Sequence, residues 1–207
     1  MSVWDELAAP EQREEVAAAA RERRWGLAFI LIGWLHLLAF GLCYYLTIVV
    51  EYHDAPAYLA IWAAELAGLA LVFHCCARRP TGVAPLPPLA RFIVRVWLAY
   101  FLLAFNLCTM NQLRGHAMFE LFPAMASLAS FGFLMLTFAV QRRFFLAVLV
   151  MFAAGQLMAA FLPHAYLIFG LAWWLVLNGV GVALLPVAWP RVGGLRPRRF
   201  AQRVSLR

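Results

Sequence analysis

Six long apolar segments dominate the hydrophobic pattern of this chain of 207 residues. A helix that crosses a membrane needs about 20 largely apolar residues, and each of these segments is long enough. Short stretches with Pro, Gly or charged residues separate them and indicate turns. The pattern therefore predicts an all-α fold, a polytopic membrane protein built as a six-transmembrane-helix bundle. The predicted spans are residues 25–50, 57–77, 92–112, 118–140, 144–163 and 166–188.

Polar segments flank the predicted bundle of residues 25–188 on both sides. Residues 1–24 interleave glutamate and arginine at helical spacing, which predicts an amphipathic N-terminal segment. Residues 189–207 form a basic tail that we expect to lie against anionic lipid headgroups. The alternative is that both segments only set the topology. After Pro190 the tail has Phe200 as its sole aromatic residue, so we expect no nucleic-acid partner.

Composition supports a membrane location for the whole chain. The sequence is 65% hydrophobic and 13% charged, with a mean hydropathy of +0.80. Soluble domains carry about 25% charged residues, and a domain of this size cannot hide so much apolar surface in one core. We therefore expect the lipid bilayer to be the solvent of the predicted spans.

The positions of the arginines predict the orientation in the membrane. All 17 basic residues are arginine, and 15 of them lie in the N-terminal segment, the tail and alternate connections. Arg114 alone lies in the opposite connections, and Arg95 lies within span three. Because positive charge stays on the cytoplasmic side, we expect both termini to be cytoplasmic. We place the protein in the bacterial cytoplasmic (inner) membrane as a multi-pass protein.

Polar side chains fall near the predicted midplane in most spans. With a rise of about 1.5 Å per residue, His36 lies about 16 Å from the inner end of its span and Glu65 about 12 Å from the outer end of its own. A charge at the bilayer centre costs at least about 2.5–3.5 kcal/mol on insertion scales. We therefore expect Glu65 to face the bundle and to pair with His36, or else to carry a proton. The further midplane candidates are Asn106, Ser127, Ser130, Gln156 and Asn178.

This polar layer has two interpretations. It is a proton relay or substrate site, because an ionisable residue inside a membrane is a functional candidate by default. Alternatively, its hydroxyl, amide and imidazole groups hold helices together by hydrogen bonds. In span four the small and polar residues recur at spacings of three and four, which places them on one helical face. Such a face is compatible with either interpretation, a pathway or a packing interface.

A second group of candidates lies at the predicted outer face. Histidine together with carboxylates suits a transition metal, but no two of these residues have the spacing of a known metal motif. A metal or proton site is therefore one interpretation, and wetted interfacial residues are the other. Haem held by two outer histidines, His53 with His164 being one option, is a further alternative, although we predict no cofactor. The outer-face candidates are Glu51, His53, Asp54, His116, Glu120 and His164.

These observations favour a small transporter or a proton- or ion-translocating protein with a midplane polar site. The alternative is a non-catalytic membrane subunit or assembly factor, whose partner is another membrane protein or a second copy of this chain. A haem- or quinone-binding redox subunit comes third, and an intramembrane enzyme fourth. The sequence has no phosphate-binding loop and no kinase or hydrolase motif.

Overall fold

The computed structural model describes residues 10–22, 24–52, 55–77 and 87–185, and this part of the chain is helical with no strand. A π-helix at Tyr45–Val49 extends the second helix, and short 3-10 turns lie at Met118–Leu121, Arg142–Phe144 and Leu162–His164. The α-helices are α1 (Pro10–Glu22), α2 (Trp25–Tyr44), α3 (Ala55–Ala77), α4 (Pro88–Leu113), α5 (Phe122–Ala139), α6 (Phe145–Ala160) and α7 (Ala165–Leu184).

Six helices of the described residues, α2 to α7, are long and apolar enough to cross a membrane. Large apolar side chains cover their outer surfaces, with Leu102 of α4 70% exposed and Leu59 of α3 67% exposed. Water would make such a surface costly, because exposed apolar area is unfavourable there. The six helices are compatible with a multi-pass membrane protein, as the hydrophobic pattern predicted.

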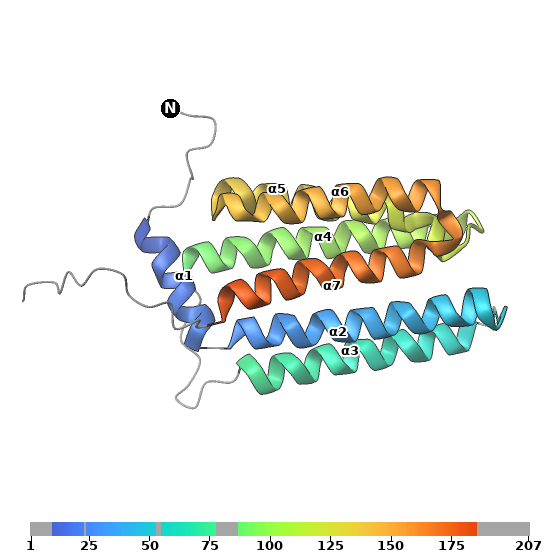
Figure 1. Ribbon diagram of the computed structural model, residues 1–207, viewed down its shortest axis with the longest axis horizontal. Helices are drawn as coiled ribbons and strands as arrows, with labels where there is room; N and C mark the ends of the chain where they lie inside the picture. The colour runs from blue at the N-terminus through green and yellow to red at the C-terminus, as the bar shows by residue number, and fades with distance from the viewer. Residues whose placement is uncertain (1–9, 23, 53–54, 78–86, 186–207) are drawn as a thin grey trace, which may run out of the picture.

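The six long helices run side by side, and α1 lies across one end of the bundle (Figure 1). We call this end the α1 end and the opposite one, which carries residues 51–52, 114–117 and 161–164, the hairpin end. Val16 and Ala20 of α1 are one turn apart, so they share a face. Both are buried, and Val16 forms a small apolar cluster with Leu89 and Ala90 of α4. The amphipathic α1 is therefore packed across the α1 end of the bundle and does not extend away from it.

Several helix ends differ from the predicted spans: α7 ends at Leu184 rather than at residue 188, and α5 begins at Phe122 after a 3-10 turn rather than at residue 118. Proline lies at or near two further ends that differ. Helix α4 begins at Pro88 rather than at residue 92, because proline is well accommodated in a first turn, where its missing N–H is not needed. Helix α6 ends at Ala160 rather than at residue 163. Phe161 leaves the helical conformation, with φ −126° and ψ 57°, and Pro163 falls in a separate 3-10 turn. The last residues of this predicted span thus belong to the turn that joins α6 to α7.

Helices α2 and α7 form the most closely packed pair, and glycines allow the approach. A Cβ atom at Gly181 would lie 2.7 Å from the carbonyl oxygen of Gly26, and a Cβ atom at Gly26 would lie 2.7 Å from that of Gly181. At mid-span, a Cβ atom at Gly33 would lie 2.6 Å from the Asn178 side-chain nitrogen. Close backbone approach at small residues is typical of helix packing in membranes. The α2–α7 pair is therefore the most extensive helix–helix contact of the bundle.

An aromatic core fills the space between α7, α4 and α5. Trp97 of α4 packs edge to face against Phe133 of α5, with ring centroids 4.9 Å apart, and also lies 5.8 Å from Trp173 of α7. Phe122 of α5 stacks on Phe169 of α7 at 5.1 Å. Such ring pairs add about 0.5–1.5 kcal/mol each beyond their buried area. The contacts of Trp97 hold α4 against α5 and α7, and the Phe122–Phe169 stack joins α5 to α7.

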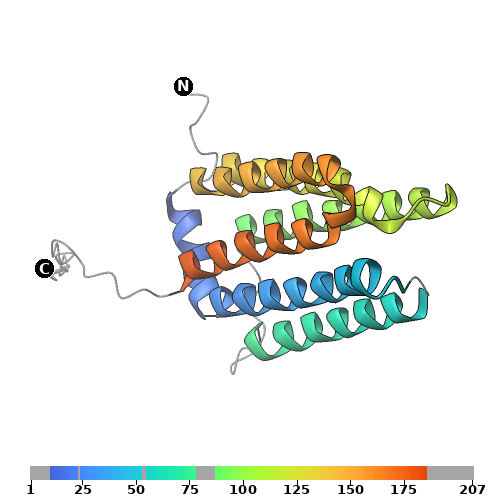
Figure 2. The ribbon, with the colours of Figure 1, turned by 45° about the vertical axis from the view of Figure 1, so that its right-hand side comes forward.

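Helix α3 lies at the edge of the bundle, beside α2 (Figure 2). Its outward face carries large exposed side chains such as Leu66 and Phe73. Because α3 packs mainly on one neighbour, the residues that face α2 decide how it is held. Those residues include the glutamate that the sequence singled out.

Candidate functional site

Glu65 is the one buried residue of α3 among the side chains that the structure describes there, residues 56–76. Its exposed fraction is 4%. In a helix that crosses a membrane, lipid-facing positions are apolar and a carboxylate turns inward. Glu65, the α3 side chain least suited to lipid, is thus the one that is buried in the bundle.

The carboxylate of Glu65 is paired with the imidazole of His36 on α2, as the sequence predicted for residues of matching depth. The contact joins Glu65 Oε1 to His36 Nδ1. It requires one proton between the two atoms, either as an Nδ1–H donating to a carboxylate or as a carboxyl O–H donating to a neutral ring. The pair is therefore built to hold a proton inside the bundle.

Two aromatic rings lie beside the histidine of the pair, and little of the glutamate is exposed. The His36 ring lies 6.0 Å from Trp173 of α7 and 6.1 Å from Phe40, one turn further along α2. His36 keeps 23% of its side chain exposed, whereas Glu65 keeps 4%. A low-dielectric surrounding strengthens the electrostatic attraction within a pair and makes an unpaired charge costly. His36 is thus the more exposed member of the pair.

The pair is one level of a regular interface between α2 and α3. Each level is one contact between a residue of the α2 segment and a residue of α3. The two residue numbers of each contact add to nearly the same total, as expected for antiparallel helices that pack without a shift. From the α1 end to the hairpin end, the levels are Leu35 with Gly68, His36 with Glu65, Phe40 with Trp62, and Thr47 with Tyr58.

A second polar level of this interface lies near the hairpin end. The Thr47 hydroxyl is 2.8 Å from the Tyr58 hydroxyl, and the Thr47 hydroxyl also donates to the carbonyl of Cys43 at 2.7 Å. The Tyr58 hydroxyl also lies 2.7 Å from the carbonyl oxygen of Tyr52. Because each hydroxyl has one proton and Thr47 gives its own to Cys43, Tyr58 donates either to Thr47 or to Tyr52. Thr47 belongs to the π-helix Tyr45–Val49, and π-bulges are frequent at functional sites. Phe40 and Trp62, with ring centroids 5.0 Å apart, separate this level from the histidine–glutamate pair.

Tyr58→Phe tests whether the Thr47–Tyr58 level holds α3 in place. The substitution removes the hydroxyl and leaves Thr47 bonded to its own helix, so we expect the free energy of unfolding to fall by about 0.6–1.7 kcal/mol, the range of interhelical hydrogen bonds in membranes. Unfolding of the purified protein by titration with a denaturing detergent measures it. Tyr45→Phe is the control, because it removes the hydroxyl of an exposed tyrosine in the π-helix. It should change the free energy of unfolding little. An equal loss in both variants would contradict this role.

The other midplane candidates do not join the pair. Asn178 lies against Gly33 and donates to the Trp174 carbonyl of its own helix at 2.8 Å. Ser130 is buried but donates to the Ala126 carbonyl one turn back. The three remaining candidates are exposed: Asn106, Ser127 and Gln156. The structure thus brings two of the seven predicted residues together, His36 and Glu65, and spreads the others over four helices.

The outer-face candidates are also dispersed among the described residues. His116 and Glu120 form an exposed pair, with Nδ1 and Oε2 2.9 Å apart. His164 accepts or donates at Nδ1 with the Tyr44 hydroxyl, 3.0 Å away. Glu51 is exposed, with φ 54°, and His53 and Asp54 lie outside the described residues. In the part of the chain that is described, no group of three His, Cys, Asp or Glu residues lies close enough to hold a metal ion.

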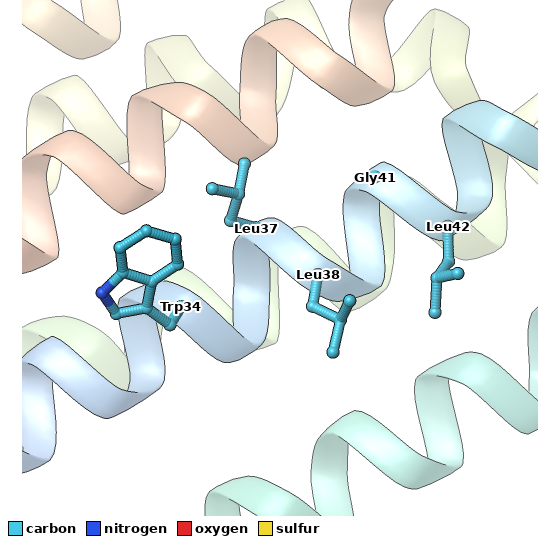
Figure 3. Close-up of a pocket in the computed structure, with 5 residues that line it drawn as sticks. All are labelled: Trp34, Leu37, Leu38, Gly41 and Leu42. Carbon is cyan, nitrogen blue, oxygen red and sulfur yellow. The ribbon is translucent and has the colours of Figure 1, made fainter.

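A shallow groove follows α2 on a different side from the pair (Figure 3). Its lining is almost entirely apolar, and neither His36 nor Glu65 contributes to it. Gly41 leaves open space there, since a Cβ atom at this position would meet nothing within 4 Å. An acyl chain suits such a groove better than a polar substrate does. The groove is lined by Trp34, Leu37, Leu38, Gly41 and Leu42.

Sequence reasoning missed the hydroxyl level at Thr47 and Tyr58 and the aromatic surround of the pair. The signal for Tyr58 is its position two turns before Glu65, on the same helical face. Trp173 has no such signal, since its neighbour His36 is 137 residues away. Comparison with protein-family models, with curated proteins and with solved structures finds no match.

Proposed function

We propose that this chain is a small proton- or ion-translocating membrane protein in which His36 and Glu65 hold the transferred proton. The observation that carries the proposal is the burial of the Glu65 carboxylate against His36, in a helix whose other described side chains are not buried. A pair that is held together by one proton needs little rearrangement to pass that proton on, because donor and acceptor are already in contact.

The interface between α2 and α3 supplies a route in this proposal. The hydroxyls of Thr47 and Tyr58 lie between the hairpin end and the pair, about 10 Å along α3 from Glu65. The rings of Phe40 and Trp62 separate the two polar levels, so a proton crosses between them only when this contact opens. The arginine distribution supports a cytoplasmic α1 end and an inner-membrane location. The basic tail, which lies outside the described residues, then faces anionic lipid.

Proton flux into liposomes tests this function. We expect the reconstituted protein to admit protons when a potassium gradient with valinomycin imposes a membrane potential, as reported by a trapped pH-sensitive dye. Glu65→Gln keeps the shape of the side chain but removes its acid, so we expect the flux to fall to the level of empty liposomes. Glu120→Gln is the matched control, because it alters an exposed histidine–glutamate pair. Flux that survives in Glu65→Gln would contradict the assignment.

A second candidate is a non-catalytic membrane subunit or assembly factor. The observation in its favour is the poor coverage of α3 and α4, which expose much apolar surface that a larger protein partner would bury. In this role the His36–Glu65 pair only fastens α3 to α2. The flux assay separates the two candidates, since a packing pair predicts no flux from the unmodified protein and a change in stability alone for Glu65→Gln.

A further inference from the structure

Helix α6 carries a row of exposed residues with the spacing of a helix–helix seam. The residues lie three and four positions apart in alternation, the repeat that lets two helices interlock along their length. The row lies opposite the face that α6 packs inward, which consists of Ala147, Met151, Ala154, Gly155 and Met158. We call the row the α6 seam, and it consists of Leu146, Leu149, Ala153, Gln156 and Ala160.

Gln156 is the residue of the α6 seam whose side chain needs hydrogen bonds that lipid tails do not offer. It is exposed, about 16 Å along α6 from Phe145, and its amide makes no hydrogen bond to another described residue. The hydrocarbon core of a bilayer is about 30 Å thick and has no water to replace such a bond. A polar group without a partner in that environment is costly. The amide therefore favours a protein neighbour over lipid.

The neighbour that fits this position is a second copy of the same chain. All copies share one orientation in the membrane, so a two-fold axis along the membrane normal sets the two α6 helices parallel and places each Gln156 at the same depth. A carboxamide both donates and accepts, so two of them satisfy each other. Ala153 and Ala160, on either side of Gln156, are small enough to let the backbones approach.

We propose that the protein forms a homodimer through the α6 seam, with the two Gln156 side chains hydrogen-bonded across the axis. One polar residue at such a seam also sets the register, because any other alignment leaves both amides in lipid. The dimer keeps the His36–Glu65 pair within each copy, since that pair lies between α2 and α3. It therefore stands or falls independently of the proton-translocating role.

The first test measures dimer dissociation in lipid. The full chain, labelled with donor and acceptor dyes, is diluted with vesicles of phosphatidylethanolamine and phosphatidylglycerol, and energy transfer is followed. We expect a dimer whose dissociation constant rises about tenfold in Gln156→Leu, which corresponds to one interhelical polar contact. Asn106→Leu is the matched control, because it removes an exposed amide from α4; we expect no change there. A monomer at every dilution, or equal effects of the two substitutions, would overturn the proposal.

The second test needs no substitution at Gln156. In a chain whose four native cysteines are replaced by alanine, Ala153→Cys and Ala160→Cys should each form an intermolecular disulfide in native membranes on mild oxidation. Leu102→Cys, exposed on α4, should not. A product with twice the mass of the chain supports the α6 seam. Cross-linking to a protein of another mass, or none at either seam position, shows that a second copy does not cover this face.

Discussion

His36→Leu is expected to lower the free energy of unfolding by about 3–5 kcal/mol, the cost of breaking a buried ion pair by removing one partner. The reason is the position of Glu65, which is 4% exposed and has α2 over it. Without the imidazole, the buried carboxyl group of Glu65 loses its hydrogen-bond partner inside the bundle. Unfolding by titration with a denaturing detergent, at constant pH, provides the measurement.

Two companion variants decide whether the loss comes from the pair. Glu65→Leu leaves His36, which keeps 23% of its side chain exposed, so we expect a smaller loss of about 1–3 kcal/mol. The double variant should return close to the unmodified protein, because apolar residues of similar volume often replace a buried pair at no cost. Additive losses in the double variant would show that the two residues are not coupled.

Gly181→Ala is expected to destabilise the protein by about 1–3 kcal/mol, the usual cost of overpacking. The new Cβ atom would lie 2.7 Å from the Gly26 carbonyl oxygen, which is backbone and cannot turn aside. Helices α2 and α7 must therefore move apart at this contact. The midpoint of thermal unfolding in a mild detergent measures the effect, and Gly26→Ala should reproduce it from the other helix.

Gly179→Ala is the control, two residues away on the same helix. A Cβ atom at Gly179 would meet nothing within 4 Å, and alanine is favoured over glycine in a helix by about 0.5–1 kcal/mol. We therefore expect the control to raise the midpoint slightly while Gly181→Ala lowers it. If both substitutions moved the midpoint in the same direction, close packing at Gly181 would not be the cause.

The helical spans were the most predictable part of this protein. A run of about 20 apolar residues can satisfy its backbone in lipid only as a helix, so no partner needs to be known to predict one. The ends were less predictable, because they depend on how a turn closes. Pro163, for example, marked a turn in the sequence, but the helix had already ended at Ala160.

The candidate site was predictable only in part. The pairing of His36 with Glu65 followed from depth, since both residues avoid lipid and two adjacent antiparallel spans bring them to the same level. The same reasoning grouped Gln156 with the pair as a midplane candidate, whereas the structure places it on the outer side of α6. Depth along a helix can be read from residue number, but the side of the bundle that a span faces cannot.

The sequence by itself therefore determined the number of long apolar helices and the position of each polar group along its helix, because these depend on local composition and on the helical rise per residue. The tertiary structure alone decided which faces meet. It joined α2 to α7 through glycines, left α3 packed mainly on α2, and turned Gln156 outward. The physical reason is that spans of similar apolarity attract lipid and one another about equally, so shape and a few polar contacts select the neighbours.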